Sequence, residues 1–96
     1  MSDYLLSDDA AEDLQHIYRA GLDRFGEAQA DQYLDEFYHL FDLFSDNPEM
    51  GVDIDVHGNK LQLHPHKSHI VIFEPIYDGV KILRIFYGGA DYFRQL

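Results

Sequence analysis

The side chains with the greatest capacity for chemistry in this sequence are cations and aromatic rings, and they gather in its second half. Arginine and tyrosine are the residue types that most often anchor protein–protein contacts, because each combines apolar area with hydrogen-bonding groups. The pattern therefore favours binding of another macromolecule over catalysis. The candidate target-binding residues are Lys60, Lys67, Arg84, Tyr87, Tyr92 and Arg94.

A structural role for the same residues is the alternative that the sequence leaves open. Arg84 stands in a strongly apolar segment and could pair with a neighbouring carboxylate across a sheet. The aromatic rings could equally pack in a core, since large apolar side chains are most often buried.

Three histidines lie close together in the segment His64–His69, a spacing that could hold a metal ion. Residues 64 and 66 would point to the same face of a regular strand. However, Pro65 interrupts the backbone ladder, no carboxylate lies within the segment, and Lys67 would repel a cation. We therefore expect ordinary histidines of a strand edge or loop, and no metal site.

Signals for covalent catalysis or nucleotide binding are weak. The chain has no cysteine, which excludes thiol chemistry and thiolate metal sites. Ser45 and Ser68 lack a recognisable serine–histidine context, and Ser7 fits a helix N-cap better than a nucleophile. No glycine-rich phosphate-binding motif is present in the sequence. The sequence therefore predicts no catalytic residue and no cofactor.

The charge is strongly negative and unevenly spread. Residues 1–50 carry 13 acidic and two basic side chains, a net of −11, whereas residues 51–96 carry five of each, a net of zero. Direct binding to nucleic acid or to an anionic membrane surface is disfavoured, because both depend on lysine and arginine. A partner with basic residues is favoured by electrostatic steering. We find no apolar run of membrane-spanning length and no signal peptide, and we expect a cytoplasmic protein.

Apolar spacing predicts two helices in the first half, after a short extended segment at residues 3–6. The first helix is expected over residues 8–25, with Ser7 as its N-cap and Gly26 as its stop. The second is expected over residues 27–45, ended by Asn47-Pro48. A pair of helices joined at one glycine is typical of an antiparallel hairpin.

The second half changes to strand-like patterns over residues 60–64, 69–74 and 80–87. Tyr77-Asp78-Gly79 supplies a hairpin turn, and residues 47–59 are expected to form an irregular loop. Because the helices must bury their apolar stripes on a sheet, we predict a single domain over residues 1–96. Its fold class is α+β: a two-layer sandwich with an N-terminal strand and an antiparallel helical hairpin packed on a twisted, mainly antiparallel sheet.

In its order and spacing of motifs, the sequence resembles the ParE toxins of the RelE/ParE superfamily over residues 4–96. The resemblance rests on Leu6-Ser7-x-x-Ala10-x-x-Asp13-Leu14-x-x-Ile17, Phe25-Gly26-x-x-Gln29-Ala30-Asp31-x-Tyr33-Leu34, Leu43, Asn47-Pro48-x-Met50-Gly51, Ser68–Phe73, Ile82–Gly88 and Asp91–Leu96. It implies a toxin of a bacterial type II toxin–antitoxin pair that inhibits DNA gyrase and is neutralised by a ParD-like antitoxin wrapped around it.

The resemblance also implies roles for individual positions. Lys60 stands where the family usually has an arginine before its second strand, Arg84 matches the arginine of the last long strand, and Arg94 matches the terminal arginine. The sequence departs from the family at Tyr87-Gly88-Gly89, where His-Gly-Arg is common. It also departs at Glu74, usually Arg or Tyr, and at Gly51–Asp55, usually Gly-Arg-x-Arg.

Two other functions stay open at this point. One is ribosome-dependent cleavage of mRNA, the activity of the RelE branch, which needs cations to hold phosphates and a general acid or base. RelE-like proteins are typically basic, whereas this chain carries a net charge of −11. The other is a detoxified module that keeps only antitoxin binding.

Overall fold

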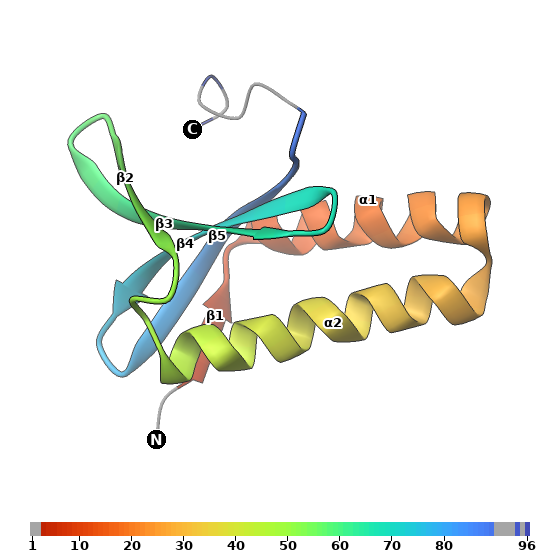
Figure 1. Cartoon of the computed structure of the whole chain (residues 1–96), viewed down its shortest axis with the longest axis horizontal. Helices are drawn as coiled ribbons and strands as arrows, with labels where there is room; N and C mark the ends of the chain where they lie inside the picture. Colours follow the sequence, from red (N-terminus) through yellow and green to blue (C-terminus); the bar gives the residue numbers. More distant parts are fainter. Residues whose placement is uncertain (1–2, 90–93, 95) are drawn as a thin grey trace.

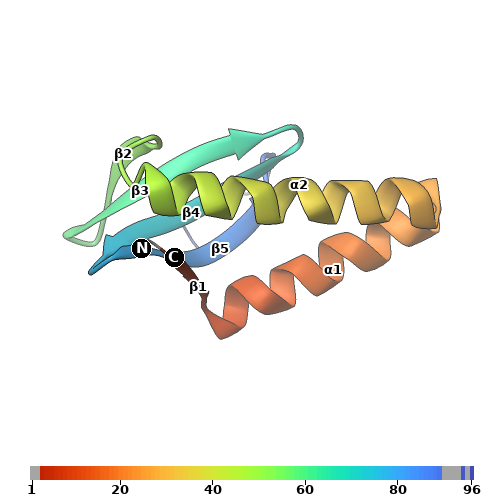
Figure 2. The same ribbon diagram turned by 90° about the horizontal axis from the view of Figure 1, so that it is seen from below.

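Two helices cover one face of a five-stranded sheet in the computed structural model, which describes residues 3–89, 94 and 96. In chain order the elements are β1 (Asp3–Leu6), α1 (Asp8–Phe25), α2 (Glu27–Asp46), β2 (Val52–Val56), β3 (Asn59–His66), β4 (His69–Ile76) and β5 (Gly79–Tyr87). The two layers separate clearly in the view of Figure 2. The predicted α+β sandwich is confirmed.

The sheet has the strand order β1-β5-β4-β3-β2. β1 runs parallel to β5, and every other neighbouring pair is antiparallel. The chain therefore places its N-terminal strand at one edge and the β2–β3 hairpin at the other (Figure 1). No helix in the described part of the chain is long and apolar enough to cross a membrane.

The helical hairpin begins and turns where the sequence predicts. The Ser7 hydroxyl oxygen accepts the Ala10 backbone N–H at 3.0 Å, which satisfies an otherwise orphan donor at the start of α1. Gly26, with φ of 87°, separates the two helices in a conformation that glycine adopts at little cost. A Cβ built on Gly21 would lie 3.3 Å from the Cβ of Ala30, so the two helices approach closely near their joined ends.

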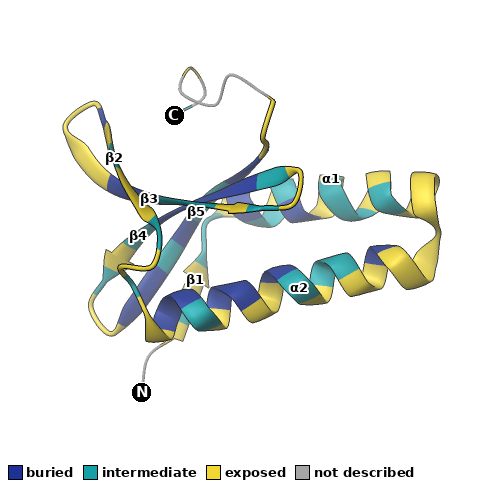
Figure 3. Cartoon of the chain, in the orientation of Figure 1, coloured by how far each residue is buried: buried dark blue, intermediate teal, exposed yellow. Residues whose placement is uncertain are grey.

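The main core lies between the helices and the sheet (Figure 3). Along α2, three fully buried phenylalanines follow one face at helical spacing and meet β-branched and aromatic residues of β4 and β5. The rings of Phe44 and Phe73 stack with their centroids 4.2 Å apart. The fully buried large side chains of this core are Phe37, Phe41, Phe44, Val71, Phe73, Val80 and Ile82.

The opposite face of the sheet carries a second, smaller apolar cluster. Alternate residues of β2 to β5 build it, which explains why β4 reads as an almost unbroken apolar run. Leu96 packs against this cluster, so the end of the chain returns to the face that the helices do not cover. The buried members are Val56, Leu61, Ile70, Ile72 and Phe86.

The expectation of an irregular loop over residues 47–59 is wrong for its second part. Val52–Val56 forms strand β2, paired antiparallel with β3. His57 and Gly58, with φ of 53° and 85°, make the two-residue turn between them, a geometry that matches the twist of a hairpin. The alternation of Val52, Ile54 and Val56 with aspartates carried the signal, but the high content of Asp and Gly hid it.

Strands β3 and β4 are also longer than predicted. β3 runs through Pro65 to His66, and β4 continues to Ile76. The β3–β4 pairing continues through Pro65, which lies opposite Ile70, to His66. The proline therefore does not end the strand, although it has no backbone N–H to donate. Residues 64 and 66 do share one face, and it is the face beneath α2, where His64 contacts Phe44 and His66 contacts Phe37.

Candidate partner-binding site

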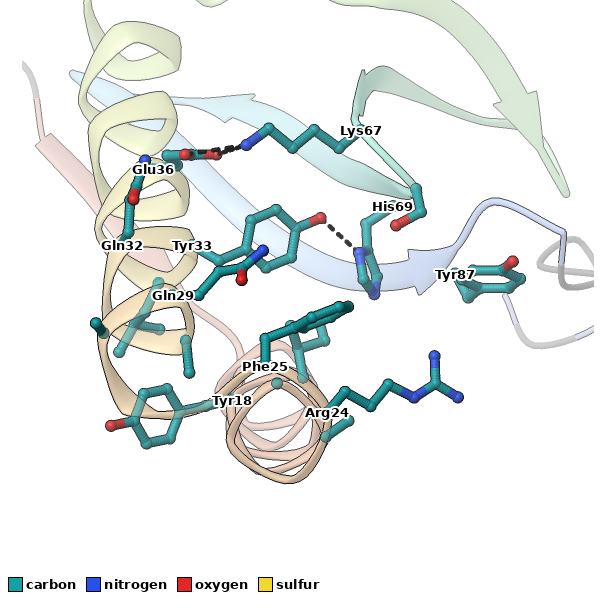
Figure 4. Close-up of a pocket in the computed structure, with 17 residues that line it drawn as sticks. Tyr18, Arg24, Phe25, Gln29, Gln32, Tyr33, Glu36, Lys67, His69 and Tyr87 are labelled. Atoms are coloured by element: carbon teal, nitrogen blue, oxygen red, sulfur yellow. Dashed lines mark hydrogen bonds and ion pairs between the residues drawn. The ribbon is translucent and has the colours of Figure 1, made fainter.

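A cleft of about 950 Å³ opens between the joined ends of the two helices and the turn between β3 and β4 (Figure 4). The helices extend past the sheet here, so side chains of α1, α2, the turn and the end of β5 face a common space. The apolar part of its lining includes Ile17, Ala30 and Leu34. The functional groups that line it include Arg24, Phe25, Tyr33, Lys67, His69 and Tyr87.

Lys67 occupies the tip of the β3–β4 turn in a left-handed conformation, with φ of 53°. Its ammonium lies 2.8 Å from the Glu36 carboxylate of α2 and 5.5 Å from the centre of the Tyr33 ring. The same carboxylate lies 2.8 Å from Nε2 of His66. Hydrogen bonding from Lys67 is the main cause that lowers the pKa of Glu36. Partial burial opposes this shift, and His66 adds to it. The turn is thus held on α2 by charge.

His69, the first residue of β4, faces the cleft and is half-buried. Its Nδ1 lies 2.7 Å from the hydroxyl of Tyr33 on α2 (Figure 4). Burial is the main cause that lowers the pKa of His69, and the neighbouring His66 lowers it further. Burial also raises the pKa of Tyr33, so both groups are uncharged near neutral pH.

Exposed aromatic rings stand at the mouth of the cleft. Tyr87, the last residue of β5, is 63% exposed and lies opposite His69 in the sheet register, with the ring centroids 6.0 Å apart. Phe25 is 60% exposed at the end of α1. Arg24 extends toward the side of the cleft on which Tyr87 lies (Figure 4). Rings and a guanidinium on one rim suit an anchoring contact with a protein segment.

Arg84 lies away from this cleft, in a two-pronged ion pair with Asp13 of α1. Its Nε and Nη2 lie 2.9 and 3.1 Å from the two carboxylate oxygens, and the side chains are only 23% and 13% exposed. A β-bulge leaves Leu83 out of the β4–β5 register beside it, and the guanidinium covers the Phe86 ring at 4.4 Å. The ion pair that the sequence left open is present, with its carboxylate on a helix rather than across the sheet.

The Asp13 carboxylate also closes the edge of the sheet. β1 ends at Leu6. Beyond it, Ser7 and Asp13 form hydrogen bonds with backbone groups of β5. Ser7 donates its N–H to the Ile82 carbonyl at 2.9 Å and its O–H to the Leu83 carbonyl at 2.7 Å, and Asp13 accepts the Ile85 N–H at 2.8 Å. Arg84 therefore helps to hold α1 on an otherwise unpaired strand edge.

The remaining predicted site residues are dispersed. Lys60 is the second residue of β3 and lies opposite Asp55, on the β2–β3 hairpin far along the sheet from the cleft. Arg94 is exposed, and Tyr92 lies outside the described residues. Of the five candidates within the described residues, Lys67 and Tyr87 are the two that line the cleft together.

The sequence interpretation missed Arg24, Phe25, Tyr33 and His69 as members of one site. The available signal was Phe25 at the hairpin tip, since an aromatic residue beside a helix-ending glycine has little sheet to pack on. Within the described residues, no group of three or more His, Asp or Glu side chains is arranged to hold a metal ion.

Comparison with known proteins places these features in a family. The family model described as "ParE toxin of type II toxin-antitoxin system, parDE" matches residues 4–92. Two curated proteins called Toxin ParE1, from two strains of Mycobacterium tuberculosis, are each 31% identical to the chain over 96 residues, covering 99% of this chain and 98% of theirs.

A solved structure, "Chromosomal ParDE TA system from P. aeruginosa", has the same fold. It matches this chain with a TM-score of 0.75 and 17% sequence identity, and the match covers 91% of this chain and 96% of the solved chain. At that identity the structural likeness supports the fold alone. The family match spans nearly the whole chain and agrees with the relatives. The chain therefore belongs to the ParE family of toxins of type II toxin–antitoxin systems.

Proposed function

We propose that this ParE-family protein inhibits DNA gyrase by binding it, without catalysis of its own, and that a ParD-like antitoxin neutralises it. Family membership supports the gyrase target. The observation that carries a binding role is the cleft, whose lining combines Tyr87, Lys67, Arg24 and Phe25 with apolar side chains. Such a surface fits the apolar face of a helix with a few polar anchors.

We further propose that the antitoxin neutralises the toxin by occupying this cleft. An amphipathic helix seated between the hairpin and the β3–β4 turn would cover the two predicted target-binding residues that lie there, Lys67 and Tyr87. The helical hairpin carries the negative charge of the chain, so the antitoxin is expected to bring basic residues against its outer surface.

The test is inducible expression in bacteria, with and without the neighbouring open reading frame, together with supercoiling assays on purified gyrase. Growth arrest relieved by the neighbouring frame, and linearised plasmid with gyrase, are the expected results. Cleaved mRNA in a translating extract, with gyrase unaffected, would replace this proposal with the RelE-type activity. Tight antitoxin binding with no effect on growth would instead identify the protein as a detoxified module that only binds the antitoxin.

The chain offers a matched pair of tyrosines to locate the site. Tyr87→Ala removes an exposed ring from the cleft, whereas Tyr77→Ala removes a ring that is 99% exposed on the β4–β5 turn, which does not line the cleft. We expect Tyr87→Ala to weaken antitoxin binding by roughly 10-fold or more, as for an anchoring aromatic residue, and Tyr77→Ala to leave it nearly unchanged. Equal effects of the two variants would remove the cleft from the proposal.

A further inference from the structure

The turn between β3 and β4 is fastened to α2 by five side chains, which we call the turn latch. His66 and Lys67 both reach the Glu36 carboxylate at 2.8 Å, and Nδ1 of His69 lies 2.7 Å from the Tyr33 hydroxyl. The Tyr33 ring also stacks on the His66 ring, with centroids 5.6 Å apart and an angle of 20° between the planes. Tyr33, Glu36, Lys67 and His69 also line the cleft, so these contacts join two of the elements that border it.

The contact between Tyr33 and His69 depends on where the protons lie. When His69 is neutral with its hydrogen on Nε2, Nδ1 accepts the hydrogen of the Tyr33 hydroxyl. When His69 is protonated, Nδ1 becomes a donor and the tyrosine hydroxyl must turn toward another acceptor. The His66 carbonyl oxygen already lies 3.4 Å from that hydroxyl. The hydrogen bond can thus survive protonation, but the added charge remains.

The surroundings of His69 are unfavourable to that charge. His66 of β3 stands opposite in register, Lys67 belongs to the same turn, and Arg24 of α1 lines the same cleft. The rings of Tyr33 on α2 and Tyr87 on β5 lie next to the imidazole, with centroids 5.6 and 6.0 Å from its centre. Of the carboxylates in the described part of this cleft, Glu36 is the one present, and His66 and Lys67 already engage it.

Burial and His66 lower the pKa of His69 below its ordinary value of 6.5. The folded protein therefore binds this proton less tightly than the unfolded chain does. The stability that comes from a neutral His69 is complete above about pH 6.5 and is lost as the pH falls toward the folded-state pKa. The cost of protonation is relieved if the turn moves into solvent.

We propose that the turn latch is a proton-operated switch: with His69 neutral it holds the turn against α2, and with His69 protonated the turn moves away and the cleft widens. The switch goes beyond the proposed function, because it is a property of the isolated chain and needs neither antitoxin nor gyrase.

A distance measurement on the whole chain tests the switch directly. The chain has no native cysteine, so Asp35→Cys on α2 and Pro65→Cys on β3, both exposed, allow two nitroxide labels to be placed specifically. Pulsed electron spin resonance then follows their separation from about pH 7.5 to pH 5, while ¹⁵N NMR follows the titration of His69. The expected result is a shift to longer distance whose midpoint matches that of His69.

Two variants separate His69 from the other titrating groups. His69→Gln offers a neutral acceptor to Tyr33 and takes up no proton, so the closed distance should persist at both pH values. His57→Asn, on the distant β2–β3 turn, keeps a residue type that accepts the left-handed conformation and should leave the midpoint unchanged.

Three outcomes would overturn the switch. The labels could keep one separation while NMR shows His69 fully protonated. The acid-induced shift could persist in His69→Gln, which would assign it to another group. The midpoints of opening and of His69 titration could differ in the native sequence, a comparison that holds even if His69→Gln does not fold. None of these results bears on toxicity, so the switch and the proposed function can fail independently.

Discussion

At the residue scale, the most informative side chain is Arg84, because the resemblance implies a role at the target and the structure gives it a role in the fold. Its guanidinium joins Asp13 of α1 to the edge of β5 and covers Phe86. Charge-assisted hydrogen bonds with this little exposure are worth more than a surface ion pair. If an Arg84 variant lost toxicity, the loss of this structural contact would have to be measured before a role in target binding could be inferred.

We expect Arg84→Ala to lower the free energy of unfolding by about 1–3 kcal/mol, because the Asp13 carboxylate loses two charge-assisted hydrogen bonds while partly buried. Urea denaturation with and without the substitution measures this change. Asp13→Asn is the matched variant, since the amide keeps an acceptor for the Ile85 N–H but loses the charge. If Arg84→Ala unfolds at the same urea concentration as the parent, the ion pair is not stabilising and a role at the target regains priority.

Glu36 gives the fold a pH dependence of its own. Its pKa is lowered chiefly by hydrogen bonding from Lys67, so the folded protein holds the Glu36 proton less tightly than the unfolded chain. This contribution to stability is complete above the ordinary value of 4.5 and is lost as the pH falls through the folded-state pKa. Urea midpoints at pH 7 and pH 3.5 should therefore differ less in Glu36→Gln than in the parent chain. An equal difference would place the acid sensitivity elsewhere.

At the element scale, β1 depends on one glycine that it does not contain. Gly79 opens β5 opposite Asp3 with φ of 155°, and a Cβ built on it would lie 1.8 Å from the Asp3 carbonyl oxygen. An alanine here must either strain its backbone or push β1 off the sheet. The N-terminal strand is thus specified by a turn residue more than 70 positions away, through close backbone packing.

Gly79→Ala should destabilise the fold by about 1–3 kcal/mol from backbone strain, with a further cost from the clash at β1. Gly58→Ala is the control, because Gly58 also has a positive φ but has nothing within 4 Å of the Cβ position. The difference between the two variants in urea denaturation isolates the clash. Hydrogen exchange should also show loss of protection in β1 for Gly79→Ala, and equal losses in both variants would contradict this reading.

The sequence correctly predicts the elements whose ends are set by the conformational preferences of nearby residues. The helices are bounded by Ser7, Gly26 and Asn47-Pro48, whose conformational preferences act within one turn, and they form where predicted. β2 was missed because two of its five residues are aspartates, which are poor strand formers and are more easily accommodated on an edge strand such as this one. The cleft was missed for a different reason: Arg24, His69 and Tyr87 meet only through the packing of three distant segments.

At the scale of the whole molecule, charge divides the protein. The helices of the first half carry the negative charge, while the sheet is balanced and supplies Lys67 and Tyr87 to the cleft. A basic partner would be drawn to the hairpin from any direction, and the cleft would then select among such partners by shape and anchoring contacts. Under the proposed function, the charge of the hairpin would attract a partner and the cleft would discriminate among partners.

The same imbalance predicts how the free chain responds to salt. With a net charge of −11, all of it from residues 1–50, the acidic helices repel one another more in the folded hairpin than in the expanded unfolded chain. The screening length falls from about 30 Å at 0.01 M to about 10 Å at 0.1 M ionic strength, which reaches across two packed helices. We therefore expect the urea midpoint to rise with sodium chloride over this range.

Two substitutions of opposite sign test whether the acidic hairpin is the cause. Asp35→Lys adds a positive charge to the exposed face of α2 and should reduce the salt dependence, because it removes repulsion that salt would otherwise screen. Lys60→Glu changes the net charge by the same amount in the opposite direction, but at the balanced end of the sheet, and should increase the salt dependence less than Asp35→Lys reduces it. A midpoint that falls with salt in the parent chain would mean that attractive pairs such as Arg84–Asp13 outweigh the repulsion among the helices.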